Sequence, residues 1–213
     1  MDFINCKLEK FKSDIVKKKV AVLGLGISNF PLVRYLAALG ADITAFDRQD
    51  KEKLWNIMDE LRDYGIKYSL GENYLKKLEG FDIIFKTPIV RNDIPELMRA
   101  KDSGAEITSE MEVFLKLCPA KTFGVTGSDG KTTTTTLIYN MLMEEGYHCW
   151  LGGNIGTPLI EKIDRIKPDD MAVIELSSFQ LHSMSVSPDV AVITNISPNH
   201  LDVHKDYHEY IEA

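Results

Sequence analysis

A glycine-rich loop in the second half of the chain limits the possible folds more than any other feature. An apolar segment at 121–126 leads into the loop Gly-Ser-Asp-Gly-Lys-Thr at 127–132, and a helical pattern follows. This order is typical of a P-loop, whose amides surround phosphate oxygens while Lys131 reaches the β- and γ-phosphates and the Thr132 hydroxyl binds Mg²⁺. The standard spacing requires glycine at position 125. The chain has Val125 there and Gly124 before it, so the motif is a variant P-loop.

Short apolar segments alternate with helical patterns along the chain, which predicts parallel βαβ units and the α/β class. In the first part we expect strands at 19–24, 41–46, 66–70, 81–85 and around Ile107, and helices at 31–39, 51–64, 94–103 and 110–117. A break at Cys118-Pro119-Ala120 precedes a second series, with strands at 121–126, 147–150, 171–176 and 190–195 and a helix from the glycine loop to about 145. We therefore place a domain boundary between 118 and 119.

Composition excludes several classes of protein. The 213 residues carry a net charge of −7, and the pI is near 5.3, whereas a nucleic-acid-binding protein usually has a basic excess. Residues 1–118 hold 19 basic and 19 acidic side chains, and residues 119–213 hold 6 and 13, which fits either metal ions or a solvated acidic surface. No apolar run is long enough to span a membrane, and the N-terminus has no secretory signal. Three separated cysteines without a CxxC pair favour the reducing cytoplasm.

A second glycine loop lies near the start of the chain. Gly24-Leu25-Gly26 follows the first expected strand and precedes a helix, as in a dinucleotide-binding fingerprint. Asp47 ends the next strand, where a carboxylate often meets a ribose hydroxyl. The third glycine of the fingerprint is replaced by Asn29. The loop therefore indicates NAD, the phosphates of another nucleotide, or a tight turn without a ligand.

Several polar residues are expected at the ligand-facing ends of the strands in the second series. Glu175 ends the apolar strand at 171–176, where a P-loop enzyme places an acid for Mg²⁺. His200, near Asp202, follows the last expected strand and is the preferred histidine, whereas His204 and His208 fit a solvated helix face. The glycines at 152–156 fit either a close approach to a ligand or an ordinary turn. The threonines at 132–136 are poor helix starters, so we expect them to face phosphate and metal or to pack against the sheet.

These motifs together resemble a known family. The ATP loop at 124–132, Gly-Asn-Ile-Gly at 153–156, Glu-Leu-Ser-Ser-Phe-Gln-Leu at 175–181, and Asn195 with His-Leu-Asp at 200–202 follow one another as in the Mur ligases. The run at 175–181 most resembles the members that add D-glutamate. The resemblance covers nearly the whole chain, weakly over 1–118 and strongly afterwards. It implies a Rossmann-like parallel-sheet domain that binds a UDP-sugar at 1–118, followed by the first part of a P-loop ATPase α/β domain at 119–213.

The resemblance also implies an activity. ATP would phosphorylate the terminal carboxylate of UDP-N-acetylmuramoyl-L-alanine, and the amine of D-glutamate would attack the acyl phosphate, in cytoplasmic synthesis of a peptidoglycan precursor. ATP and Mg²⁺ are the implied cofactors. Nucleic acid and membrane insertion are not expected, and a full-length protein would be a monomer. The alternatives are a non-enzymatic nucleotide-binding module, another amide ligase of the Mur or folylpolyglutamate type, and an NAD-dependent oxidoreductase.

Site residues follow from the matching motifs. Lys131 and His200 would be catalytic, and the metal ligands would be Thr132, Glu175 and His200. The residues implied to bind ATP are Gly127, Ser128, Asp129, Gly130, Lys131, Thr132 and Thr133. The residues implied to bind the substrate are Ile27, Ser28, Asp47, Arg48, Asn154, Ser178 and Gln180.

The chain departs from the family pattern in three places. Thr87-Pro88-Ile89 stands where Ser-Pro-Gly is usual, and Ser128-Asp129 stands where Thr-Asn is frequent. Family members have three domains and about twice this length, and the family's carbamylated lysine would fall at position 214. We therefore expect a fragment that lacks the C-terminal domain and has no ligase activity by itself.

Overall fold

The computed structural model describes residues 3–198 and 204–213. The chain forms two compact units. One runs from Cys6 to Glu110, and the other runs from Met111 to Ala213 and includes the segment before Cys6. The domain boundary at 118/119 stays a prediction, since the division into compact units falls eight residues earlier, at the start of a helix.

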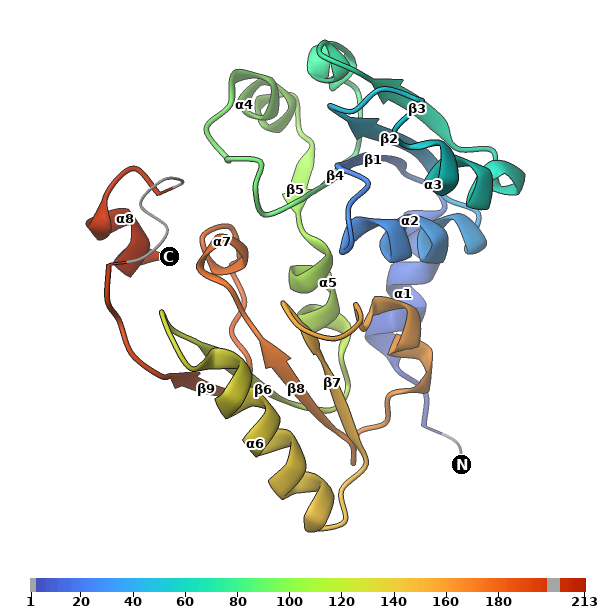
Figure 1. Ribbon diagram of the computed structural model, residues 1–213. Coiled ribbons are helices and arrows are strands. Elements are labelled where there is room, and N and C mark those ends of the chain that lie inside the picture. Colours follow the sequence, from blue (N-terminus) through green and yellow to red (C-terminus); the bar gives the residue numbers. More distant parts are fainter. Residues whose placement is uncertain (1–2, 199–203) are drawn as a thin grey trace. The chain divides into compact units, whose positions relative to one another are not determined.

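The first unit is built on a parallel five-stranded sheet with the strand order β3-β2-β1-β4-β5 (Figure 1). Its strands are β1 (Lys19–Leu23), β2 (Asp42–Asp47), β3 (Lys67–Leu70), β4 (Ile83–Lys86) and β5 (Glu106–Thr108). Its helices are α1 (Cys6–Ile15), α2 (Asn29–Ala38), α3 (Trp55–Glu60) and α4 (Pro95–Asp102), with 3-10 turns η1 (Arg62–Tyr64) and η2 (Tyr74–Lys77). The strand order reverses between β1 and β4, and crevices at such switch points bind ligands in open α/β sheets.

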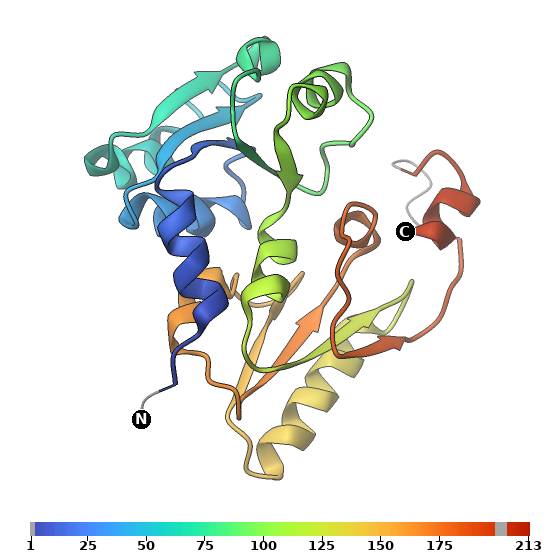
Figure 2. The ribbon, with the colours of Figure 1, turned by 180° about the vertical axis from the view of Figure 1, so that it is seen from behind.

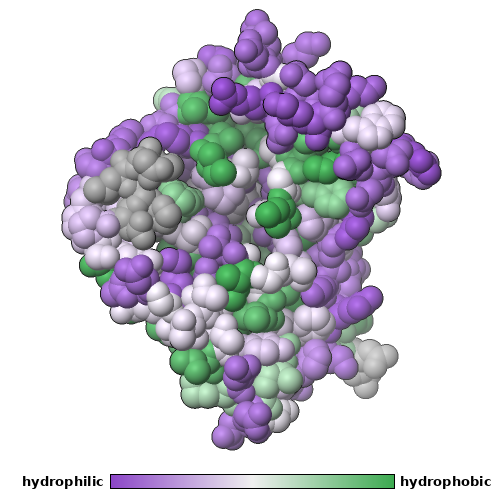
Figure 3. Space-filling view, in the orientation of Figure 1, coloured by the Kyte–Doolittle hydropathy of each residue, from purple (hydrophilic) through white to green (hydrophobic). Residues whose placement is uncertain are grey.

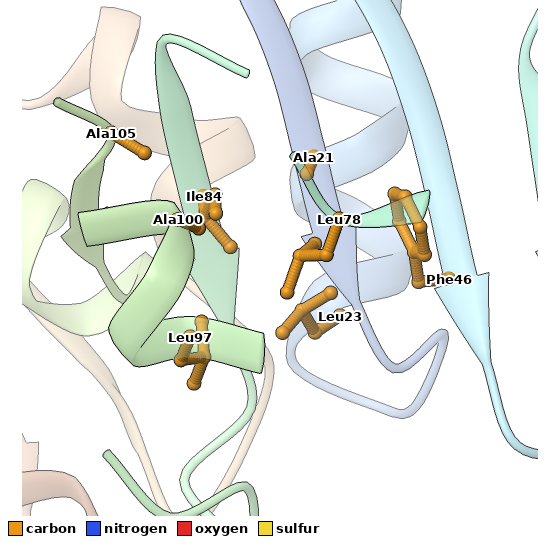
Figure 4. Packing of buried hydrophobic residues seen from close by; sticks show 8 residues of the cluster. All are labelled: Ala21, Leu23, Phe46, Leu78, Ile84, Leu97, Ala100 and Ala105. Carbon is orange, nitrogen blue, oxygen red and sulfur yellow. The ribbon is translucent and has the colours of Figure 1, made fainter. Parts of the chain in front are cut away.

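Apolar side chains fix the position of this sheet. Ala21 and Leu23 of β1, Phe46 of β2 and Ile84 of β4 belong to one buried cluster that includes side chains of α4 (Figure 4). The cluster is completed by Leu78, Leu97, Ala100 and Ala105. Helix α2 packs against β1 and β2. Both faces of the central strands are thus covered, as expected for a parallel sheet with apolar strands.

The second unit contains a parallel four-stranded sheet with the order β7-β8-β6-β9. Its strands are β6 (Lys121–Thr126), β7 (Cys149–Gly153), β8 (Met171–Glu175) and β9 (Val190–Ile193). Helix α6 (Lys131–Glu144) lies along β6, β7 and β8 and covers one face (Figures 1 and 2). The remaining elements are α5 (Glu110–Leu117), η3 (Ile160–Arg165), α7 (Ser178–Leu181) and α8 (Tyr207–Glu212).

The α/β class and the alternation of strands and helices are confirmed, but three elements differ from expectation. Helix α1 was not predicted, although its buried Leu8 and Ile15 lie seven residues apart on one face. The helix expected at 51–64 is shorter and ends in a 3-10 turn at Gly65, which has a positive φ. Strand β7 begins at Cys149 rather than Tyr147 and continues through Gly152 and Gly153, because these glycines let it approach neighbouring backbone.

No helix within residues 3–198 and 204–213 is both long and apolar enough to cross a membrane.

Candidate functional site

The glycine loop between β6 and α6 is held by the end of β9. The backbone N–H of Ser128 donates to the carbonyl of Asn195 at 3.0 Å. The side chain of Asn195 accepts from the N–H of Asp129 and donates to its carbonyl. Thr194 donates to the same carbonyl at 2.6 Å. The regular pairing of β6 with β9 ends at Thr126 and Ile193, and beyond that point side chains after β9 hold the loop.

Gly127 could not be replaced by a larger residue without disturbing this clamp. Its φ is +134°, and a Cβ there would collide with the Thr194 hydroxyl and the Asn195 backbone. Gly124, by contrast, lies inside β6, and its missing Cβ leaves room for Pro188. The glycine that departs from the standard P-loop spacing thus serves packing within the sheet.

The ammonium of Lys131, at the start of α6, folds back over the loop. It donates to the carbonyls of Gly127 at 2.6 Å and Ser128 at 3.0 Å. These are hydrogen bonds to neutral acceptors, and a phosphate oxygen is a stronger partner for an ammonium group. The side chain can therefore exchange loop carbonyls for a nucleotide phosphate.

Three predicted residues meet beside the loop. The hydroxyl of Thr132 donates to Oε2 of Glu175 at 2.7 Å, and the amide of Asn154 donates to Oε1 at 2.9 Å. The Glu175 residue is 2% exposed. Its carboxylate, the threonine hydroxyl and the asparagine carbonyl supply hard oxygen ligands, which Mg²⁺ prefers. The residues present therefore fit a magnesium site.

Glycine also allows this arrangement. Gly153 of β7 pairs in register with Glu175 of β8 and has a φ of +96°. A Cβ at Gly153 would collide with the Glu175 carbonyl oxygen, and the N–H of Asn154 donates to that same oxygen at 2.8 Å. The close approach of β7 to β8 thus places the Asn154 amide on the Glu175 carboxylate.

The threonine run has divided roles. Thr132 faces Glu175, whereas the hydroxyls of Thr135 and Thr136 donate to the carbonyls four residues earlier, at Lys131 and Thr132. Thr135 is fully buried, and Thr133 is exposed. Thr135 is therefore a packing residue, and the contact of other members of the run with phosphate and metal stays a prediction.

Two predicted substrate residues lie on the short helix α7. Gln180 is buried and accepts hydrogen bonds from the N–H and hydroxyl of Ser177, which forms a capping box. Ser178 lies 3.0 Å from Nε2 of His204, which is buried against Phe179 instead of lying on a solvated face. The expectation of a wet His204 was wrong, because its ring packs among aromatic side chains.

The residue pattern did not reveal the contact of α8 with the nucleotide loop. The phenol of Tyr210 lies 2.7 Å from the Ser128 hydroxyl, which also donates to the Ser197 carbonyl. The spacing of Tyr207, Tyr210 and Ile211 places them on one side of a helix, but it does not identify what that side contacts. The predicted His200 lies outside the described residues.

In the first unit, the glycine loop after β1 is held from two sides. Asp47 is buried, and its carboxylate accepts from the N–H of Leu25 at 2.8 Å and of Gln49 at 2.8 Å. Asn29, which replaces the third glycine of the fingerprint, is buried and donates to the Leu23 carbonyl at 2.9 Å. The Asn29 side chain thus occupies the helix–strand contact that a glycine would leave open.

The predicted residues around this loop differ in exposure. Ile27 is 85% exposed, and Arg48 is also exposed. Ser28 precedes α2 and makes no capping hydrogen bond with its side chain. Asp47 supports the loop through backbone amides, and its contact with a ribose stays a prediction.

Comparison with known proteins identifies the family of both units. Residues 18–109 match the Mur ligase MurD-like N-terminal domain, and residues 125–213 match the Mur ligase middle domain. The chain belongs to the Mur ligase family. A UDP-N-acetylmuramoylalanine--D-glutamate ligase of Acetivibrio thermocellus is 64% identical over 210 residues, and one of Ruminiclostridium cellulolyticum is 62% identical. These matches cover 99% of this chain and 45% of each relative, so the chain spans about half the length of the curated relatives it matches.

Solved structures show the same fold. The UDP-N-acetylmuramate:L-alanyl-gamma-D-glutamyl-meso-diaminopimelate ligase from Neisseria meningitides matches with a TM-score of 0.51 and 16% identity, over 91% of this chain and 65% of that one. At this identity the likeness concerns the fold alone.

Proposed function

We propose that this chain belongs to an ATP-dependent ligase that joins D-glutamate to UDP-N-acetylmuramoyl-L-alanine through an acyl phosphate, in peptidoglycan precursor synthesis. One observation carries the proposal. Thr132 and Asn154 both donate hydrogen bonds to the Glu175 carboxylate, beside the glycine loop that leads to Lys131. The names of the relatives at 62–64% identity support the choice of substrates.

In the second unit, the loop and α6 would hold the nucleotide. Backbone amides at 127–130 would surround the phosphates, and the Lys131 ammonium would move from the Gly127 and Ser128 carbonyls to the γ-phosphate. Thr132 and Glu175 would hold Mg²⁺, which supplies charge neutralisation on the transferred phosphoryl group. Asn154 would keep the Glu175 carboxylate oriented toward that site.

In the first unit, the loop after β1 would bind the UDP part of the substrate. Asn29 closes the helix–strand contact that the NAD fingerprint leaves open for a third glycine. Ile27, Ser28 and Arg48 surround the loop and would contact the nucleotide. Ser178 would line the substrate channel in the second unit, and His200 would serve a second metal.

The first test is binding of ATP to the 213-residue chain with Mg²⁺ and with EDTA. We expect Mg²⁺-dependent binding that weakens in Thr132→Val, a substitution that keeps the shape and removes the hydroxyl. Thr133→Val is the matched control, since Thr133 is exposed on the same turn. ATP binding that is absent, or that is the same in EDTA, would contradict the proposed magnesium site.

The second test is calorimetric titration with UDP-N-acetylmuramoyl-L-alanine and with NADH. We expect the UDP-sugar to bind more tightly than NADH. Tighter binding of NADH would favour the oxidoreductase alternative and overturn the proposed substrate.

A further inference from the structure

Lys86 is a buried cation that the proposed function leaves unused. It is the last residue of β4 and is 3% exposed. Among the described residues, its ammonium makes one hydrogen bond, to the Val90 carbonyl at 2.9 Å, and no salt bridge. Burial lowers the pKa of this ammonium to about 8. A buried charge with one neutral acceptor is unfavourable, so its retention calls for a function.

The position of Lys86 is next to the glycine loop of the first unit. It pairs in register with Leu23, the residue directly before Gly24. The two strands flank the switch point of the sheet, where ligands bind in this class of fold. Register partners in neighbouring strands are about 5 Å apart, so the backbone of Lys86 lies close to the start of the loop, and its ammonium lies at the Val90 carbonyl of the turn that follows.

The segment after Lys86 is packed onto the same loop. The N–H of Thr87 donates to the Leu23 carbonyl, and the N–H of Val90 donates to the Thr87 carbonyl, which closes a turn. A Cβ at Gly24 would lie 2.7 Å from the Thr87 methyl group. Lys86 fastens this turn through Val90, so the turn and the glycine loop form one assembly.

The glycine loop itself offers donors for an anion. Among residues 3–198 and 204–213, the backbone amides of Gly26, Ile27 and Ser28 donate no hydrogen bond to another residue. Successive amides of this kind bind phosphate groups, especially before a helix such as α2. The amides follow β1 and Lys86 ends β4, so both lie at the carboxyl ends of these two paired strands.

We propose that the buried ammonium of Lys86 stabilises the diphosphate of a uridine nucleotide bound at the loop between β1 and α2. This inference rests on the proposed function and adds a residue to it. The charge acts across a desolvated region, where a charge pair several ångströms apart is worth roughly tenfold or more in affinity.

Other charges near the site do not replace this role. The titratable and charged residues of the surrounding elements are Asp47 at the end of β2, Arg48 after it, Tyr74 in η2, the Arg91–Asp93 ion pair, Glu96 in α4 and Glu110 in α5. Burial is the cause that lowers the pKa of Lys86. Because no neighbouring carboxylate in the described part of the chain offsets this effect of burial, a bound diphosphate would supply the negative charge that favours the protonated form of Lys86.

The experiment compares UDP and uridine by calorimetry at pH 7 in the wild type, Lys86→Met and Lys67→Met. Lys67 is an exposed lysine at the start of β3 and is paired with Asp42, so it is a matched control for loss of charge. We expect Lys86→Met to weaken UDP binding roughly tenfold and to change uridine binding less than twofold. Equal weakening of both ligands would assign Lys86 to the shape of the turn and overturn the electrostatic role.

A second measurement uses the wild type alone and does not depend on how the variant folds. Titrations with UDP at pH 8, in buffers of different ionisation enthalpy, report proton uptake. With a pKa of about 8, Lys86 is half protonated there, so binding of an anion should take up to about half a proton. The terminal phosphate of UDP contributes little, since its second pKa is about 6.

The outcomes separate this inference from the proposed function. Wild type that binds no UDP would overturn both. Two results would overturn only the role of Lys86. One is UDP binding by the wild type without proton uptake at pH 8. The other is a UDP affinity of Lys86→Met within twofold of the wild type.

Discussion

In the proposed function, the ammonium of Lys131 binds the nucleotide phosphates in the second unit. We expect Lys131→Ala to weaken ATP binding by roughly tenfold or more, because a hydrogen bond to a charged group contributes about 1.5–3 kcal/mol. Lys162→Ala removes a half-buried lysine outside the loop, which is bonded to Thr157, and serves as control. Fluorescence titration with an ATP analogue measures both variants. An affinity of Lys131→Ala within threefold of the wild type would contradict the assignment.

Lys86 should also make the stability of the chain depend on pH. Its pKa is about 8 in the folded chain, against an ordinary value of 10.5. Between these values the unfolded chain holds a proton that the folded chain has released, so the free energy of unfolding rises with pH. The rise attributable to Lys86 is up to about 3 kcal/mol. Urea unfolding at pH 7.5, 9 and 10 should show it in the wild type and not in Lys86→Met. Parallel curves for the two proteins would refute it.

At the scale of elements, Gly153 decides how closely β7 approaches β8. Gly153→Ala introduces a Cβ against the Glu175 carbonyl at a φ of +96°. Gly146→Ala is a matched control, since Gly146 has a φ of +89° and open space around it. The control should lose about 1–2 kcal/mol of unfolding free energy, and Gly153→Ala about 1–3 kcal/mol more. Urea unfolding measures both variants. Equal losses of unfolding free energy would show that β7 and β8 move apart at Gly153 without a further cost.

Strand β9 is an edge of the second sheet and pairs only with β6 among the described strands. Ile193, at its end, is 60% exposed. Unpaired apolar edges favour association between copies, so we expect concentration-dependent self-association that Ile193→Lys reduces.

Leu137→Lys is the control for this prediction. It removes an exposed apolar side chain from α6, a region where hydrophobic side chains are visible at the surface (Figure 3). Analytical ultracentrifugation compares the two variants. An equal effect of both would indicate association through general hydrophobicity and not through the strand edge.

The sequence predicts those elements that are specified by residues close together in the chain. Alternating apolar strands, Gly40 after α2 and the loop before α6 depend on neighbours in the chain. The family resemblance predicted that Thr132 and Glu175 share one site, whereas the hydrogen bond from Asn154 to Glu175 depends on the sheet order, which brings β7 next to β8. The burial of His204 and the bond from Tyr210 to Ser128 connect residues up to 82 positions apart, and no local pattern encodes them.

At the scale of the whole molecule, each of the two compact units carries one of the glycine loops proposed to bind a nucleotide. A ligand that binds only folded protein stabilises it by about 2.7 kcal/mol at a hundredfold excess over its Kd. For units of this size that corresponds to a shift of roughly 10 °C in the unfolding midpoint. We therefore expect ATP with Mg²⁺ to raise one thermal transition and UDP to raise another.

Two substitutions assign each transition to its unit. Lys131→Ala should reduce the shift caused by ATP to about half or less and leave the shift caused by UDP unchanged, because it alters only the loop before α6. Lys86→Met should reduce the shift caused by UDP and leave that of ATP unchanged, because its side chain lies beneath the turn after β4. Differential scanning calorimetry of the wild type and both variants, with and without each ligand, is the measurement. A single transition that both ligands raise would mean that the units unfold together, and a substitution that abolishes both shifts would contradict the assignment of one nucleotide to each unit.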